Sequence, residues 1–176
     1  MAVIAFNKTK EDYGWMSNMS AHRVRYQDEW FPTAEHLFQF MRYEGMTPVL
    51  LNNKNDAVEW LDDARVKKEI LETTNPLFAK KIAQKYRKLW TTTKEHDLEV
   101  MGKVVRWKLA YHSEYIRMLL ATGEQLIIED ASDRESGSGK FWGAALREDG
   151  SWDGENNLGR IWMAVREDLK RVLIPS

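Results

Sequence analysis

The chain has 176 residues, a length suited to one domain with a full hydrophobic core. Its 26 basic and 27 acidic side chains nearly cancel, so its overall charge does not favour nucleic-acid binding. There is no cysteine, which excludes disulfides, thiolate metal sites and a thiol nucleophile. No apolar run approaches the ~20 residues that span a bilayer, and no signal peptide is recognisable, so we expect a cytoplasmic protein without membrane contact.

The N-terminal residues predict two short strands separated by a loop. Residues 3–6 are apolar, residues 7–21 are rich in small and polar side chains, and residues 22–27 alternate as a half-buried strand does. A turn is expected at 28–29.

The next stretch, residues 30–43, predicts a helix with a polar edge. Pro32 and Thr33 mark its start, and we expect it to run to Gly45. At about 100° per residue, the polar edge contains Glu35, Gln39 and Arg42 within about 60° of one another. An apolar stripe lies beside it at the i, i+3, i+4 and i+7 positions Ala34, Leu37, Phe38 and Met41.

Two interpretations of this polar edge remain open. The edge can face water, with Glu35 stabilised by the helix dipole. Alternatively it can line a site, which the aromatic pair Trp30 and Phe31 before the helix and His36 on the adjoining face favour.

The middle of the chain is predicted to be helical. Helices are expected at 56–63, at 66–73, at 77–90 and at 94–111. The third of these has an apolar stripe, so we interpret its basic side chains as a solvated face: Lys80, Lys81, Lys85, Arg87 and Lys88.

Lys108 lies at the edge of the apolar side of the 94–111 helix, between Met101 and Val104 on the helical wheel. Its ammonium can extend to water along the protein surface. Alternatively, burial lowers the pKa of the lysine and makes its neutral amine a nucleophile.

The C-terminal third predicts a helix at 113–121, strands at 126–128 and 140–145, and a closing helix capped by Asn156 or Asn157. Residues 132–139 are rich in Ser and Gly and form either a surface loop or a lid. Residues 154–159 form either a capped turn or a backbone anion site. The element order predicts one α+β domain over residues 1–176, mainly helical around a small antiparallel sheet.

The residues also limit the chemistry. Phosphate-loop, dinucleotide and zinc-helix motifs are missing and the four histidines are scattered, so we expect neither cofactor nor metal. One carboxylate and one possible buried amine remain. Such a pair suits cleavage of an N-glycosidic bond, because an acid can protonate the leaving base and an amine can capture C1 of the sugar as an imine. Arg42 could hold a phosphate. Tryptophans in loop-like segments could stack on a base or fill the core.

Several segments resemble the NADAR family of YbiA-like N-glycosidases. They occur in the family's order and cover roughly residues 6–170: the 15–19 segment, the run PTAEHLFQFMRY at 32–43, Lys108, the 121–123 turn with Glu129, Phe141-Trp142-Gly143, and residues 154–159.

The resemblance implies a YbiA-like fold and hydrolysis of a ribosylated base. Two substrates are implied. One is ADP-ribosyl-guanine, free or in nucleic acid, and the other is a phosphoribosylamino-pyrimidine intermediate of riboflavin synthesis. It implies that Glu35 is the general acid/base and Lys108 the sugar-capturing amine. With Trp30 and Asp133 added from the reasoning on this chain, the expected substrate-binding residues are Trp15, Ser17, Asn18, Trp30, His36, Gln39, Arg42, Asp133, Trp142, Gly143, Asn157 and Gly159.

The chain departs from the family pattern at two points. Gly139 stands where many relatives have an Asp, three residues before Trp-Gly, and Asp133 is the candidate replacement. The 132–139 loop also looks longer than the family's usual connection. A non-catalytic module that binds ADP-ribose or a nucleotide without cleaving it is the competing interpretation.

Overall fold

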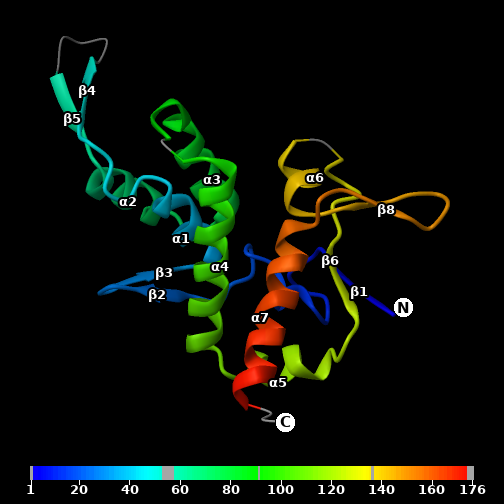
Figure 1. Ribbon diagram of the computed structural model, residues 1–176. Coiled ribbons are helices and arrows are strands. Elements are labelled where there is room, and N and C mark those ends of the chain that lie inside the picture. The colour runs from blue at the N-terminus through cyan, green and yellow to red at the C-terminus, as the bar shows by residue number, and fades with distance from the viewer. Residues whose placement is uncertain (1, 53–57, 91, 136, 174–176) are drawn as a thin grey trace.

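The computed structural model of the chain describes residues 2–52, 58–90, 92–135 and 137–173 (Figure 1). Its α-helices are α1 Ala34–Met41, α2 Asp63–Leu71, α3 Pro76–Lys85, α4 Lys94–Tyr111, α5 Glu114–Ala121, α6 Ser138–Trp142 and α7 Asn157–Leu173. Its strands are β1 Val3–Phe6, β2 Val24–Tyr26, β3 Glu29–Phe31, β4 Val49–Asn52, β5 Val58–Leu61, β6 Leu126–Glu129, β7 Ala145–Leu146 and β8 Trp152–Asp153. The α+β, mainly helical class is therefore confirmed.

The described strands form four separate pairs instead of one small antiparallel sheet. β2–β3, β4–β5 and β7–β8 are antiparallel neighbours in the chain. β1 and β6 pair in parallel, and the helices α1 to α5 lie between them in the sequence. Two parallel strands must be joined by a long crossover, so β1 and β6 pair although they are far apart in the sequence.

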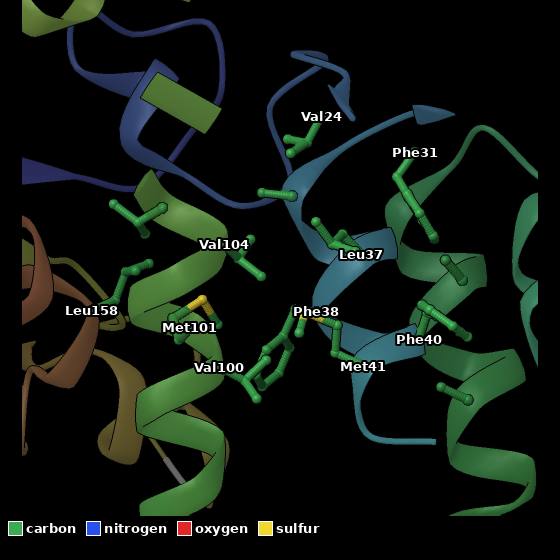
Figure 2. Close-up of a cluster of buried hydrophobic side chains, with 14 of the residues drawn as sticks. Val24, Phe31, Leu37, Phe38, Phe40, Met41, Val100, Met101, Val104 and Leu158 are labelled. Atoms are coloured by element: carbon green, nitrogen blue, oxygen red, sulfur yellow. The ribbon is translucent and has the colours of Figure 1, made fainter. Parts of the chain in front are cut away.

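Helix α4 is the centre of the packing. It contacts α1 on one side and α7 on the other, while α1 also contacts α2 and α3, and α7 covers β6 (Figure 1). Figure 2 shows Phe38 of α1, Met101 of α4 and Leu158 of α7 in this buried cluster. The apolar stripes of three helices thus meet in one core, which is the largest source of stability for such a domain.

Side-chain caps define where the central helices begin. The hydroxyls of Thr33 and Thr93 accept from the backbone N–H groups of His36 and His96, at the starts of α1 and α4. Such caps satisfy N–H groups that have no partner within the helix. α1 ends at Met41, before the expected end at Gly45, which has a positive φ of 71°.

Three predicted elements are wrong in type or length. Residues 58–61 of the expected 56–63 helix form strand β5, paired with β4, while residues 56 and 57 lie outside the described residues. The 77–90 helix is α3 followed by a 3₁₀ turn at Arg87–Leu89. The strand expected at 140–145 is instead helix α6 and the two-residue strand β7. Periodicity does not distinguish strand from helix in such short segments, and pairing with β4 decides the first case. None of the described helices has the length and apolar character that a membrane crossing requires.

Candidate active site

A pocket of about 440 Å³ lies where α1 and α3 face the end of β6 and helix α6, beside α4. Seven of the predicted site residues line it: Ser17, Asn18, Glu35, Gln39, Arg42, Asp133 and Trp142. Its volume is in the range of small-molecule sites.

The polar edge of α1 is buried and faces this pocket. Glu35 is only 6% exposed and Gln39 only 1%. The Gln39 amide nitrogen donates to Glu35 Oε1 at 2.7 Å, and Arg42 Nη1 donates to the Gln39 carbonyl oxygen at 3.2 Å. Of the two interpretations left open by the sequence, the water-facing one is excluded by this burial.

Arg42 is held firmly by protein groups. Its Nε and Nη2 donate to the two carboxylate oxygens of Asp97 on α4, at 3.0 and 2.6 Å. Its guanidinium lies over the rings of Phe38 and Trp90, at 4.4 and 4.2 Å from their centroids. The two guanidinium nitrogens of Arg42 that could bind a phosphate together are therefore already bonded to Asp97.

A second carboxyl group, Glu129 at the end of β6, also lines the pocket. Burial raises its pKa, and the negative charge of Glu35 raises it further, while Arg134 acts in the opposite direction. Arg134 Nη2 lies 3.3 Å from Glu129 Oε1, whereas Oε2 is buried without a hydrogen-bond partner. Two carboxyl groups in different surroundings thus share one cavity.

The loop after β6 supplies Asp133 and Arg134 to the pocket. Arg134 Nε donates to Asp133 at 3.1 Å. A Cβ atom at Gly139 would lie 1.8 Å from the Arg134 carbonyl oxygen. The aspartate that many relatives have at position 139 therefore does not fit this loop conformation, and Asp133 is the acidic group that the loop brings to the cavity.

Aromatic and basic side chains complete the walls. The half-buried Trp90 and Trp142 both line the pocket, and the ring of Trp142 packs edge-on against Phe38, 5.4 Å away. Lys80 of α3 lines the pocket as well, and its positive charge acts on Glu129. The interpretation of Lys80 as part of a purely solvated face is wrong.

Lys108 is fully buried behind the 15–20 segment and is not one of the pocket-lining side chains among the described residues. Its Nζ donates to the Trp15 carbonyl, to the Ser17 carbonyl at 2.9 Å and to the Ser20 hydroxyl at 2.7 Å. Burial lowers its pKa to about 7. Because Ser17 and its neighbour Asn18 line the pocket, Lys108 is one backbone layer away from the cavity.

Three other predicted side chains lie outside the pocket lining. The Trp15 ring stacks on Tyr115 at 4.6 Å. His36 is fully buried, with Nε2 2.9 Å from the Thr73 carbonyl oxygen and Nδ1 2.8 Å from the Thr33 hydroxyl. Trp30 is 38% exposed on β3, beneath the guanidinium of Arg23.

Gly143, Asn157 and Gly159 hold the start of α7 against the site. A Cβ at Gly159 would lie 2.3 Å from the Ile127 carbonyl, and one at Gly143 would lie 2.3 Å from the Glu129 carbonyl. The side-chain amide of Asn157 donates to the Phe141 carbonyl at 2.8 Å. The two glycines therefore allow close backbone approach at the Ile127 and Glu129 carbonyls, and Asn157 ties the start of α7 to the residue before Trp142.

Several pocket residues were not predicted as site residues, among them Lys80, Trp90, Glu129 and Arg134. Glu129 had two signals, its position just after a predicted strand and its place among the segments that resemble the NADAR family. The others come from segments whose approach to the pocket depends on tertiary packing. In the described ranges, no group of three or more His, Asp or Glu side chains is placed to hold a metal ion.

Comparison with known proteins identifies relatives over nearly the whole chain. N-glycosidase YbiA of Escherichia coli (strain K12) is 29% identical over 171 residues, which cover 95% of this chain and 88% of that protein. A riboflavin biosynthesis protein of Vibrio vulnificus is 27% identical over 95% of this chain and 38% of its own length. The NMR structure of Escherichia coli YbiA superposes with a TM-score of 0.71 at 25% identity, covering 99% of this chain and 89% of that one. The NADAR domain family model matches residues 5–170, and the chain therefore belongs to the NADAR family.

Proposed function

We propose that the protein is a hydrolase that cleaves the N-glycosidic bond of a ribosylated base. The observation that carries this proposal is the buried carboxylate of Glu35, held by Gln39 at the wall of a cavity of ligand size. Membership of the NADAR family and the printed name of the relative YbiA, an N-glycosidase, support the same reaction class.

In this proposal Glu35 is the general acid/base. N-glycosidic cleavage develops positive charge on the sugar and negative charge on the departing base, so an acid at the base and an anion near the sugar both lower the barrier. Glu35 has no direct ion pair with a cation among the described residues, and its hydrogen bond from Gln39 orients one oxygen. The other oxygen is left to meet the substrate.

Lys108 is the proposed sugar-capturing amine. Burial gives it a pKa of about 7, so neutral amine is available near neutral pH. To reach C1 of the sugar, its amine must give up its bonds to the carbonyls of Trp15 and Ser17. The proposal therefore requires the 15–20 segment to move away from the Lys108 amine when substrate binds.

The pocket walls support a proposal for the substrate class. Trp90 and Trp142 offer aromatic faces for a base, with stacking worth about 1–3 kcal/mol per base. Lys80 and Arg134 provide positive charge that can bind a phosphate. Arg42 does not serve this purpose, because its guanidinium already pairs with Asp97. We propose a phosphorylated ribosyl or ADP-ribosyl conjugate of a purine or an amino-pyrimidine, and the name of the Vibrio vulnificus relative favours the latter.

The test supplies ADP-ribosylated guanosine and, separately, a phosphoribosylamino-pyrimidine, and measures free base by chromatography. Release from either by wild type, and its loss in Glu35→Gln, is the expected result. Thermal stabilisation by both compounds without any base release would instead establish the non-catalytic binding module.

A second arm tests Lys108. Borohydride added during turnover should reduce an imine and leave a sugar-sized mass on the protein, which Lys108→Ala should lack. Base release without an adduct would show that Lys108 does not capture the sugar. Its role would then be structural, through its hydrogen bonds to the 15–20 segment.

A further inference from the structure

Glu129 has a carboxyl oxygen without a partner, at the wall of the pocket. Its side chain is 13% exposed, and Oε2 is buried without a hydrogen-bond donor among the described residues. Arg134 lies at 3.3 Å from Oε1 only. An ionised carboxylate with one oxygen in this position loses hydration without replacement, which is costly.

A proton on Oε2 resolves this problem. A protonated carboxyl group is a hydrogen-bond donor. Oε2 is buried, but Glu129 lines the pocket and its side chain is 13% exposed, so a turn of the carboxyl group would bring this donor to a ligand there. The surroundings act in the same direction: burial raises the pKa of Glu129, and the charge of Glu35 raises it further, against Arg134 and Lys80.

Glu35 has different surroundings. Its Oε1 accepts a hydrogen bond from the Gln39 amide at 2.7 Å, and it lies in the first turn of α1. Two carboxyl groups in unlike surroundings divide acid and base roles in many hydrolases.

We propose that Glu129 is the proton donor to the leaving base, while Glu35 takes the proton from the nucleophile. This assignment rests on the proposed function and divides the acid/base work given above to Glu35 alone.

The step balances as follows. The bond between C1 of the sugar and the base nitrogen breaks, and its electron pair stays on the nitrogen. The Glu129 carboxyl proton moves to that nitrogen, so the base leaves neutral. On the direct route a water molecule forms the new bond to C1, and its proton moves to the Glu35 carboxylate. On the other route the neutral amine of Lys108 forms that bond and loses its proton to Glu35; the bond between C1 and the ring oxygen then opens, with a proton on that oxygen, to give an imine. Water adds to C1 of the imine, and the bond from C1 to the lysine nitrogen breaks, which releases the sugar and the amine. Solvent exchange then returns a proton to Glu129 and removes one from Glu35.

The first test compares kcat and KM for Glu129→Gln, Glu129→Asp and a matched control, Glu69→Gln. Glu69 is a similarly buried carboxylate, 20% exposed, paired with Arg65 and Tyr86 away from the pocket. A general acid contributes about 10²–10⁴-fold. We expect Glu129→Gln to lose about that much in kcat with KM nearly unchanged, Glu129→Asp to recover at least part of it, and Glu69→Gln to match wild type.

The wild-type kcat should also fall as pH rises through the raised pKa of Glu129, and Glu129→Gln should lack this alkaline limb. A kcat within threefold of the control, or an effect on KM alone, would overturn the inference. Base release by Glu129→Gln at nearly the wild-type rate defeats this inference only, whereas no release by wild type defeats the proposed function.

A second measurement does not depend on the variant folding. Carbon-13 NMR of wild type labelled at glutamate carboxyl carbons, with Glu129 assigned through its own backbone amide, follows its titration directly. We expect Glu129 to hold its proton to a higher pH than the exposed glutamates. Titration together with the exposed glutamates would contradict the assignment.

Discussion

The Gln39 side-chain amide donates to Glu35 Oε1 at 2.7 Å, one helical turn along α1. Its orientation is fixed by Arg42, because a guanidinium only donates and Arg42 Nη1 contacts the Gln39 oxygen at 3.2 Å. Asp97 holds Arg42 in turn from α4. The carboxylate at the pocket wall is thus oriented by a chain of contacts that begins on another helix.

Removing the amide should weaken catalysis more than folding. Gln39→Met keeps the side-chain length but deletes the donor to Glu35. A hydrogen bond to a charged group is worth about 1.5–3 kcal/mol, which corresponds to a loss in kcat of roughly 10- to 100-fold. Steady-state kinetics with a thermal unfolding control measures this, and an unchanged kcat would show that Gln39 does not orient Glu35.

The ion pair of Arg42 and Asp97 should contribute strongly to stability. Their side chains are 10% and 14% exposed, so Asp97→Asn leaves a largely buried cation without its counter-charge. We expect the free energy of unfolding in urea to fall by about 3 kcal/mol. The control is Glu99→Gln on the same helix, which loses only an exposed pair with Lys103. Equal effects of the two substitutions would contradict this account.

We expect the free energy of unfolding to depend on pH because of Lys108. Burial lowers its pKa to about 7, compared with 10.5 for an exposed lysine, so between these values the unfolded chain binds more protons than the folded chain. Stability therefore rises with pH in this window. Lys108→Met lacks the titrating group and should lack the rise. The difference in unfolding free energy, wild type minus Lys108→Met, should increase from about pH 7 to about pH 10, and a flat difference would show that the ammonium stays charged.

Gly139→Asp tests the departure from the family pattern. Its Cβ would lie 1.8 Å from the Arg134 carbonyl, so the loop must shift. We expect a lower melting temperature and no gain in base release, because the shift also displaces Arg134 from Glu129. A gain in activity with unchanged stability would mean that the loop readily adopts the relatives' conformation.

The sequence predicted the parts of the fold that depend on local patterns. Helices such as α4 and α7 follow from their apolar stripes and caps, and the helical wheel placed Glu35, Gln39 and Arg42 on one edge. That edge was ambiguous, because burial depends on what packs against it. Here α3 and the end of β6 supply the opposite wall.

The remaining features depend on contacts between distant segments. Residues 58–61 were predicted as helix because so short a segment does not define its period, and pairing with β4 decides that they form β5. The parallel pairing of β1 with β6 has no local signal. Lys80 was assigned to a solvated face because its own helix has an apolar stripe, yet it lines the pocket and its charge acts on Glu129.

The central claim is that Glu35 cleaves an N-glycosidic bond in the pocket. The most direct measurement is single-turnover release of free base by wild type and by Glu35→Gln, with substrate affinity measured separately by calorimetry. We expect Glu35→Gln to bind substrate with nearly wild-type affinity and to release base at least about 100-fold more slowly. Release by Glu35→Gln at the wild-type rate would contradict the account.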